Sequence, residues 1–121
     1  MTAKLLKQVP LFSSLPDSEI ERLAGSLRGC EFKAGEMLME EGQTEGRCFI
    51  MVDGDVEVIK ALGTPDEHML GQRGPGTLLG EMSLFSLAGE HTASVRALSD
   101  VALLEFTRTD LNDLLLRQPY L

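Results

Sequence analysis

Residues 30–62 read CEFKAGEMLMEEGQTEGRCFIMVDGDVEVIKAL, a series of short apolar and β-branched runs divided by turns that contain glycine. Runs of this kind are typical of β-strands. The clearest turn is Asp53-Gly54, between FIMV and DVEVIK, because glycine readily adopts the positive φ angle that a two-residue hairpin needs. The stretch therefore predicts a β-rich domain with a hairpin at Asp53-Gly54.

The same pattern continues toward the C-terminus. HMLGQ (68–72), TASVRAL (92–98) and VALLEFT (101–107) are three further predicted strands, and GTPDE (63–67) reads as a polar tip. About eight short strands at these turn spacings are typical of a closed or double-sheet β-roll. One short apolar helix, predicted at 81–87, interrupts the roll, and such an interruption indicates a functional feature.

A helix is predicted before the strands, in LPDSEIERLAGSLRG (15–29). Its apolar residues recur at helical spacing and form one stripe, which consists of Ile20, Leu23, Ala24 and Leu27. Pro16 suits the first turn of this helix, and Gly29 is the predicted stop.

A second helix is predicted after the last strand. Thr107 and Asp110 have the spacing of a capping box, in which each side chain binds the other residue's backbone N–H. The residues that form the apolar face of this helix are Leu111, Leu114 and Leu115. Pro119 is its predicted end.

The composition limits the partners of the chain. Its 121 residues suffice for one core, and the formal net charge of −8 argues against nucleic acid or an anionic membrane as a partner of this segment. The chain contains no apolar run that could span a bilayer and no signal-peptide pattern, so we expect a cytoplasmic domain. Cys30 and Cys48 lack metal-site spacing and are interpreted as small apolar side chains.

Three stretches resemble one known family. LFSSLPDSEIERLA, FKAGEMLMEEGQTEGRCFIMVDGDVEV and GPGTLLGEMSLF are similar to the cyclic nucleotide-binding domain of the catabolite activator protein, of kinase regulatory subunits and of cyclic-nucleotide-gated channels. The resemblance covers nearly the whole chain. It implies a mainly β domain, a double-stranded β-roll or jelly roll with an N-terminal helix, a short phosphate-cassette helix and a C-terminal helix. Residues 1–121 would form one domain, with helical segment 1–29, roll 30–107 and the start of a helical lid at 108–121.

The resemblance also implies a ligand site in GEMSLFSLAGEHT (80–92). In the family, the residues matching Gly80 and Glu81 approach the ribose, and Glu81 would accept a hydrogen bond from the 2′-hydroxyl. The amides near Met82 and Ser83 would face the cyclic phosphate, as unpaired N–H groups at a helix start can. The family's Ser/Thr that follows the phosphate-binding arginine falls at Thr92.

The family's arginine is absent, because its position holds His91. A neutral imidazole offers one donor where a guanidinium offers two, and losing one charge-assisted hydrogen bond costs about 1.5–3 kcal/mol. That loss is about ten- to a hundredfold in affinity. Arg73 occupies a position that is usually aliphatic in the family and close to the pocket, so it is a candidate for the missing cation. Arg96 is a poorer candidate, because it lies on the opposite strand face from His91, Ala93 and Val95.

Three classes of function are candidates for this chain. The first is a regulatory sensor that binds cAMP, cGMP or a related phosphorylated molecule as an effector and acts on a fused or docked output domain, with a homodimer of the full protein left open. The second is a degenerate fold that has lost its ligand and serves as an interaction domain. The third is a metal-dependent, cupin-like enzyme, which two histidines, His68 and His91, do not support. We therefore expect no enzyme activity, no metal and no cofactor.

The acidic pairs Glu40-Glu41 and Asp66-Glu67 are interpreted as solvated turns, and His68 as the end of an exposed strand.

Overall fold

The computed structural model describes residues 2–10, 12–43, 47–80 and 91–118. The helices of this described part are α1 (Thr2–Lys7), α2 (Asp17–Ser26) and α4 (Arg108–Arg117). The strands are β1 (Arg28–Phe32), β2 (Met37–Met39), β3 (Arg47–Asp53), β4 (Val56–Lys60), β5 (His68–Arg73), β6 (Leu78–Leu79), β7 (Ser94–Ala97) and β8 (Val101–Thr107). The predicted helix at 81–87 lies outside the described residues.

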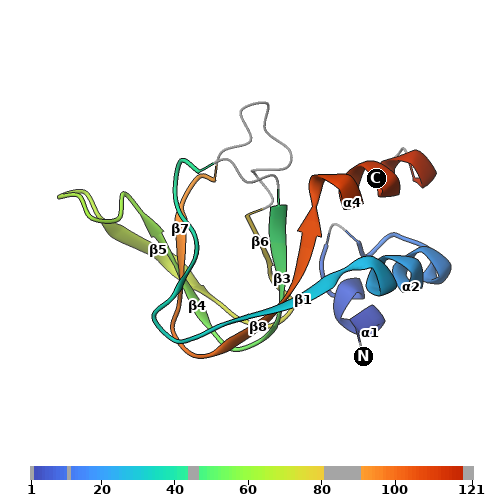
Figure 1. Cartoon of the computed structure of the whole chain (residues 1–121), viewed down its shortest axis with the longest axis horizontal. Helices are drawn as coiled ribbons and strands as arrows, with labels where there is room; N and C mark the ends of the chain where they lie inside the picture. Colours follow the sequence, from blue (N-terminus) through green and yellow to red (C-terminus); the bar gives the residue numbers. More distant parts are fainter. Residues whose placement is uncertain (1, 11, 44–46, 81–90, 119–121) are drawn as a thin grey trace.

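The strands form two antiparallel four-stranded sheets. The first has the order β1-β8-β3-β6 and the second has the order β2-β7-β4-β5. The strands curve around a common interior, and the helices α1, α2 and α4 lie together on the far side of the first sheet (Figure 1). The predicted double-sheet β-roll with flanking helices is confirmed.

Strand β3 is buried on both faces and separates two apolar clusters. Its alternating residues Cys48 and Ile50 face the helices, whereas Phe49 and Met51 face the second sheet, as the two-residue period of a strand requires. The helix-side cluster comprises Leu6, Val9, Phe12, Leu15, Ile20, Leu23, Cys48, Ile50, Phe106, Leu111 and Leu114. The roll cluster comprises Leu38, Met39, Phe49, Met51, Val56, Leu79, Val95, Ala97, Val101 and Leu103.

The two predicted helices form, with one correction. In α2, Ile20 and Leu23 are buried, and α4 begins with the predicted capping box between Thr107 and Asp110. The helix α2 ends at Ser26, however, and Gly29 lies inside β1 and pairs with Leu104, so Gly29 as the helix stop is wrong. Helix α1 lies within the helical segment 1–29 that the resemblance implied, although no local pattern predicted a separate helix there. None of the helices in the described part of the chain has the length and apolar character that a bilayer crossing requires.

The Asp53-Gly54 turn is real, but the predicted hairpin is wrong. Strand β3 pairs with β6 and β8, whereas β4 pairs with β5 and β7, so the turn carries the chain from one sheet to the other. Gly54 has a φ of +93°, and a Cβ there would lie 2.5 Å from the carbonyl oxygen of Asp100. The turn packs against the β7–β8 connection, where the Asp55 N–H donates to Ser99 Oγ at 3.0 Å.

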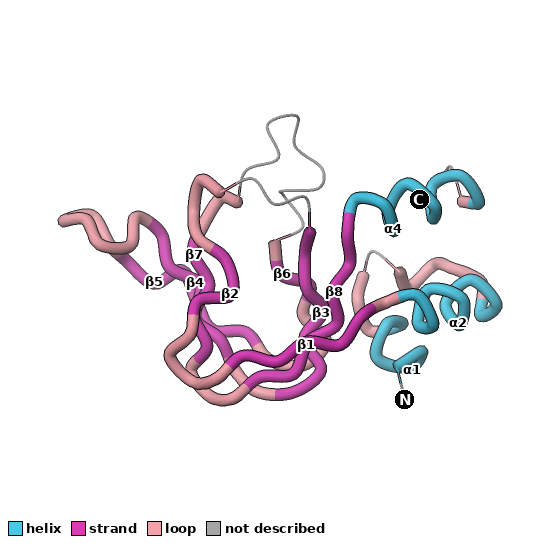
Figure 2. Tube along the Cα trace, viewed as in Figure 1, coloured by secondary structure: helices cyan, strands magenta, loops and turns pink. Residues whose placement is uncertain are grey.

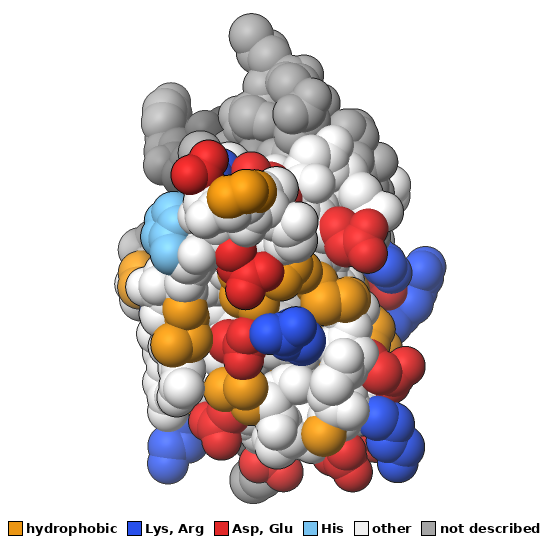
Figure 3. Space-filling view, turned by 90° about the vertical axis from the view of Figure 1, so that its left-hand side faces the viewer, with side chains coloured by type: hydrophobic (Ala, Val, Ile, Leu, Met, Phe, Trp, Pro, Cys, Tyr) orange, Lys and Arg blue, Asp and Glu red, His pale blue; other side chains and the backbone are white. Residues whose placement is uncertain are grey.

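The hairpin that does form is β4–β5. Its strands pair from Val56 opposite Arg73 to Lys60 opposite His68, and the polar tip projects from the roll (Figure 2). Strand β5 is the edge of its sheet, and Met69 and Leu70 are exposed there. On this side of the molecule, acidic and basic side chains alternate with apolar ones (Figure 3).

Candidate functional site

A cavity of about 150 Å³ opens inside the roll, at the edge of the roll cluster. Strands from both sheets contribute to its wall, and four of the predicted site residues lie on it. The described residues that line it are Met39, Val58, Arg73, Leu78, Leu79, Gly80, His91, Thr92, Ala93 and Val95. The wall is thus largely apolar with a few polar groups, as small-molecule sites commonly are.

Gly80 follows β6 directly and lets its neighbours approach the backbone closely. Its φ is +78°, which L side chains rarely adopt. A Cβ at this position would lie 2.9 Å from Met39 Sδ and 3.2 Å from His91 Cε1. A side chain at position 80 would therefore displace two groups of the cavity wall.

His91 is buried, with 3% of its surface exposed, and lines the cavity. Its backbone pairs with the turn that follows β2: the His91 N–H donates to the Gln43 carbonyl at 2.9 Å, and its carbonyl accepts from the Gly42 N–H at 2.9 Å. Two backbone hydrogen bonds thus fix the depth at which the imidazole enters the roll. Thr92 is exposed and also lines the cavity.

Arg73, at the end of β5, is exposed and lines the same cavity. Its Nη1 donates to the carbonyl oxygen of its neighbour Gln72 at 2.8 Å. A Cβ on Gly71 would lie 2.5 Å from this Nη1, so the lack of a side chain at position 71 leaves room for the guanidinium. Arg96 pairs with Glu57 at 2.6 Å on the other face of its strand, as predicted from the alternation of side chains.

The predicted residues Glu81, Met82 and Ser83 lie outside the described residues. The structure therefore brings together Arg73, Gly80, His91 and Thr92 on one wall, and the roles of all seven remain predictions. His68 is not among the described lining residues; it is exposed, with Nδ1 2.9 Å from the Asp66 carbonyl oxygen. Within the described part of the chain, no group of three or more His, Cys, Asp or Glu side chains has a metal-site arrangement.

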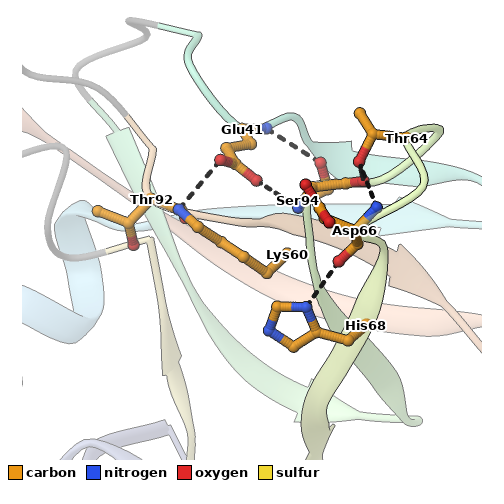
Figure 4. Close-up of polar contacts among 8 residues, drawn as sticks. Glu41, Lys60, Thr64, Asp66, His68, Thr92 and Ser94 are labelled. Carbon is orange, nitrogen blue, oxygen red and sulfur yellow. Dashed lines mark hydrogen bonds and ion pairs between the residues drawn. The ribbon is translucent and has the colours of Figure 1, made fainter.

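Sequence reasoning missed Glu41 and Lys60, which lie beside the site (Figure 4). Glu41 lies in an exposed turn, as expected, and in addition its carboxylate accepts from the Ala61 N–H at 2.9 Å and pairs with Lys60 Nζ at 3.0 Å. Two contacts hold the pKa of Glu41 below its usual range: the hydrogen bond from the Ala61 N–H has the larger effect, and the Lys60 ammonium the smaller. The two residues are distant in sequence and not neighbours in any strand register, so no local pattern links them.

Neither cysteine is among the described residues that line the cavity. Both are thiols, and β8 lies between the strands that carry them, because Cys30 pairs with Leu103 and Cys48 with Phe106. The pKa of the Cys30 thiol is raised, mainly by burial and to a smaller extent by the negative charge of Glu105. Their interpretation as apolar side chains is consistent with the burial of Cys48 and the partial burial of Cys30.

Comparison with known proteins identifies the class. The family profile described as "Cyclic nucleotide-binding domain" matches residues 30–118. This match spans the roll and α4, and the chain therefore belongs to the cyclic nucleotide-binding domain family.

Individual relatives agree with this assignment. The chain is 30% identical over 115 residues to a putative potassium channel protein of Rhodopseudomonas palustris, covering 95% of this chain and 27% of the channel. It is 30% identical to a cyclic AMP receptor protein of Thermus thermophilus, covering 94% of this chain and 52% of the receptor. The solved N-terminal domain of a transcriptional regulator from Streptomyces coelicolor matches with a TM-score of 0.84 and 33% identity, covering 95% of this chain and 79% of that one. The chain thus spans about half or less of the two curated relatives.

Proposed function

We propose that the chain is a regulatory sensor domain that binds a cyclic nucleotide, cAMP or cGMP, or a related phosphorylated small molecule, and acts on an attached output module. The observation that carries the proposal is that Arg73, Gly80, His91 and Thr92 lie on the wall of one cavity in the roll. Membership of the family and similarity to a protein named as a cyclic AMP receptor support it.

The chemistry of the wall suits a monoanionic sugar-phosphate. Two ionisable side chains, His91 and Arg73, are the candidate cations among the described lining residues, and Gly80 permits close approach of a ligand to the backbone. The volume of about 150 Å³ is below the roughly 300–1,000 Å³ of sites that enclose a whole drug-sized ligand. The cavity would therefore hold the cyclic phosphate and ribose, with the base outside it.

Ligand-dependent stability tests the proposal. A ligand at a hundred times its Kd adds about 2.7 kcal/mol to the free energy of unfolding. We expect cAMP or cGMP to raise the melting temperature of the domain, measured by calorimetry alongside cyclic dinucleotides. No rise with any of these compounds at millimolar concentration would contradict the proposal and favour the alternative, a domain that has lost its ligand and acts only in interactions. The relatives lend that alternative no support.

Two variants test the cations. His91→Arg is expected to tighten binding at pH 7.5 by about ten- to a hundredfold, because a guanidinium restores a permanent charge and a second donor. His68→Arg is the matched control, since it adds the same charge at an exposed position away from the cavity wall. If both variants bind equally, or His91→Arg binds no more tightly than the parent, His91 does not contact the anion.

Arg73→Leu is expected to weaken binding by a similar factor if the guanidinium reaches the anion. Arg22→Leu, on the exposed face of α2, removes the same charge elsewhere. Equal affinity in these two variants would end the role proposed for Arg73.

Binding should also strengthen as the pH falls from 7.5 to 6, because an imidazole ordinarily titrates near pH 6.5 and gains a proton in this range.

A further inference from the structure

The segment 91–94 is held from outside the cavity by two other parts of the chain. One is the turn after β2, at 41–43, and the other is Lys60 at the end of β4. Glu41 and Lys60 from these parts lie next to Thr92 (Figure 4), which lines the cavity.

Lys60 joins these parts through one ammonium group. Its Nζ donates to the Thr92 carbonyl oxygen at 2.8 Å and pairs with Glu41 Oε2 at 3.0 Å. The other carboxylate oxygen of Glu41 accepts from the Ala61 N–H at 2.9 Å. Because Lys60 is neutralised by Glu41 and is not among the described lining residues, we assign it no direct contact with a ligand.

The turn contributes three further hydrogen bonds to the same segment. The Glu41 N–H donates to Ser94 Oγ at 3.0 Å, the Gly42 N–H donates to the His91 carbonyl at 2.9 Å, and the His91 N–H donates to the Gln43 carbonyl at 2.9 Å. Gly42 adopts a φ of +88°, which turns the chain at this point. Each of residues 91, 92 and 94 is thereby tied to a group on another part of the chain.

We propose that Glu41, Lys60 and Ser94 form a latch that fixes the backbone of His91 and Thr92 and thereby sets the affinity of the anion site. Glu41, Lys60 and Ser94 are positioning residues, because they act on the ligand only through residues 91 and 92. A binding group must stay within about 0.5 Å of its productive position to retain its effect. The inference about affinity rests on the proposed function, whereas the fixing of the backbone does not.

An isolated surface ion pair would not justify this inference, since exposed pairs contribute little to stability. Here the ammonium also binds a backbone carbonyl of a predicted site residue, and the carboxylate also accepts a backbone N–H. The lowered pKa of Glu41 is consistent with these contacts.

Hydrogen exchange tests the latch without a ligand. In Lys60→Gln, the amides of His91 and Gly42 are expected to exchange about three- to tenfold faster than in the parent, because their hydrogen bonds join the parts that Lys60 holds together. Lys60→Arg should restore the slow rates. Lys33→Gln is the matched control, since Lys33 also pairs with a carboxylate, at 4.0 Å from Asp100, but outside this segment. Amides of the β3–β8 ladder should not change in any of these variants.

Titration with cAMP and cGMP then tests the consequence for the site. Lys60→Gln is expected to weaken binding about three- to tenfold, Lys60→Arg to restore it, and Lys33→Gln, with the same loss of charge, to change it less than about twofold. Glu41→Gln should weaken binding in the same direction, and the double variant Glu41→Gln/Lys60→Gln should be no weaker than Lys60→Gln alone, because both residues belong to one unit.

Each result has a distinct meaning. If the His91 and Gly42 amides exchange equally fast in the parent, Lys60→Gln and Lys33→Gln, the latch is overturned. If exchange responds but Lys60→Gln and Lys33→Gln bind the nucleotide equally well, the latch does not serve the site, and the inference about affinity is overturned. If the parent protein binds neither nucleotide, the proposed function and this affinity effect both fail, while the exchange rates still support or overturn the fixing of the backbone.

Discussion

The helix-side cluster and the roll cluster share β3 and β8 as a common wall, yet they are completed differently. On the helix side, apolar stripes of α1, α2 and α4 cover the sheet, and Phe12, Ile20 and Phe106 are fully buried. Inside the roll, the cluster ends at a cavity beside Gly80 and His91. The strands β3 and β8 therefore face a packed core on one side and a cavity on the other. The difference arises because helices cover one face, whereas the second sheet lies opposite the other.

The largest effect is expected on the helix side. Phe106→Ala should lower the free energy of unfolding by about 3–5 kcal/mol, because it removes a fully buried ring that packs edge-on against Phe12 with centroids 5.4 Å apart. Urea denaturation measures the loss. The nucleotide affinity of the folded fraction should stay unchanged, and a parallel loss of affinity would mean that the two clusters are not independent. Phe106→Leu, a smaller loss, provides the same comparison if the alanine variant does not fold.

Gly54→Ala should have the next largest effect, about 2–4 kcal/mol, because it combines an unfavourable positive φ with a clash against the Asp100 backbone. Gly35→Ala separates the two causes. Gly35 has nearly the same φ, +89°, and open space around its Cβ position, so only the backbone term of about 1–2 kcal/mol remains. If urea denaturation shows that the two variants lose the same free energy of unfolding, the close packing of Gly54 against Asp100 is contradicted.

Gly80→Ala is expected to cost about 1–3 kcal/mol, less than Gly54→Ala, because the crowded group is mainly the flexible thioether of Met39 and not backbone. Unlike the two preceding variants, it should also weaken nucleotide binding, since a Cβ would press on His91. Calorimetry for the affinity, together with urea denaturation, checks both outcomes. Unchanged affinity would remove Gly80 from the proposed site.

The smallest effect is expected at Glu41. Its folded-state pKa is lowered, so its contacts with Ala61 and Lys60 stabilise the protein above the ordinary pKa of a glutamate and are lost as the pH falls through the lower, folded-state value. The latch should therefore persist between pH 7.5 and 6, and any change of nucleotide affinity in that range reports on another group. Carboxyl NMR of Glu41 measures the titration; a midpoint at or above the ordinary value would contradict these contacts.

Local sequence patterns predicted the elements well where neighbouring residues suffice. The stripe at Ile20 and Leu23, the capping box at Thr107 and the strand 101–107 are confirmed, because helix faces, caps and strand alternation are set within a few residues. Gly80, His91, Thr92 and Arg73, which were expected at the site from the family resemblance, line one cavity, whereas their roles in binding stay predictions. That Arg73 shares a cavity with His91 depends on the pairing of β5 with β4 and β4 with β7.

The expected hairpin at Asp53-Gly54 failed for a general physical reason. Asp53-Gly54 has the composition of a hairpin turn, but composition fixes only the positive φ and the change of direction, and the hydrogen-bond partners of β3 and β4 are chosen among all strands. Glu41 lies in an exposed turn, as expected, but only the folded chain brings Lys60 and Ala61 to its carboxylate.

By itself, the sequence determined which residues alternate, which turns need glycine and where α2 and α4 begin, because each depends on interactions between near neighbours in the chain. Only the tertiary structure decided which strands share a sheet, that a cavity remains beside Gly80, and that Lys60 holds the carbonyl of Thr92. Those outcomes depend on contacts between residues far apart in the sequence. Such contacts form only once the chain is compact, so no local pattern reports their free energies.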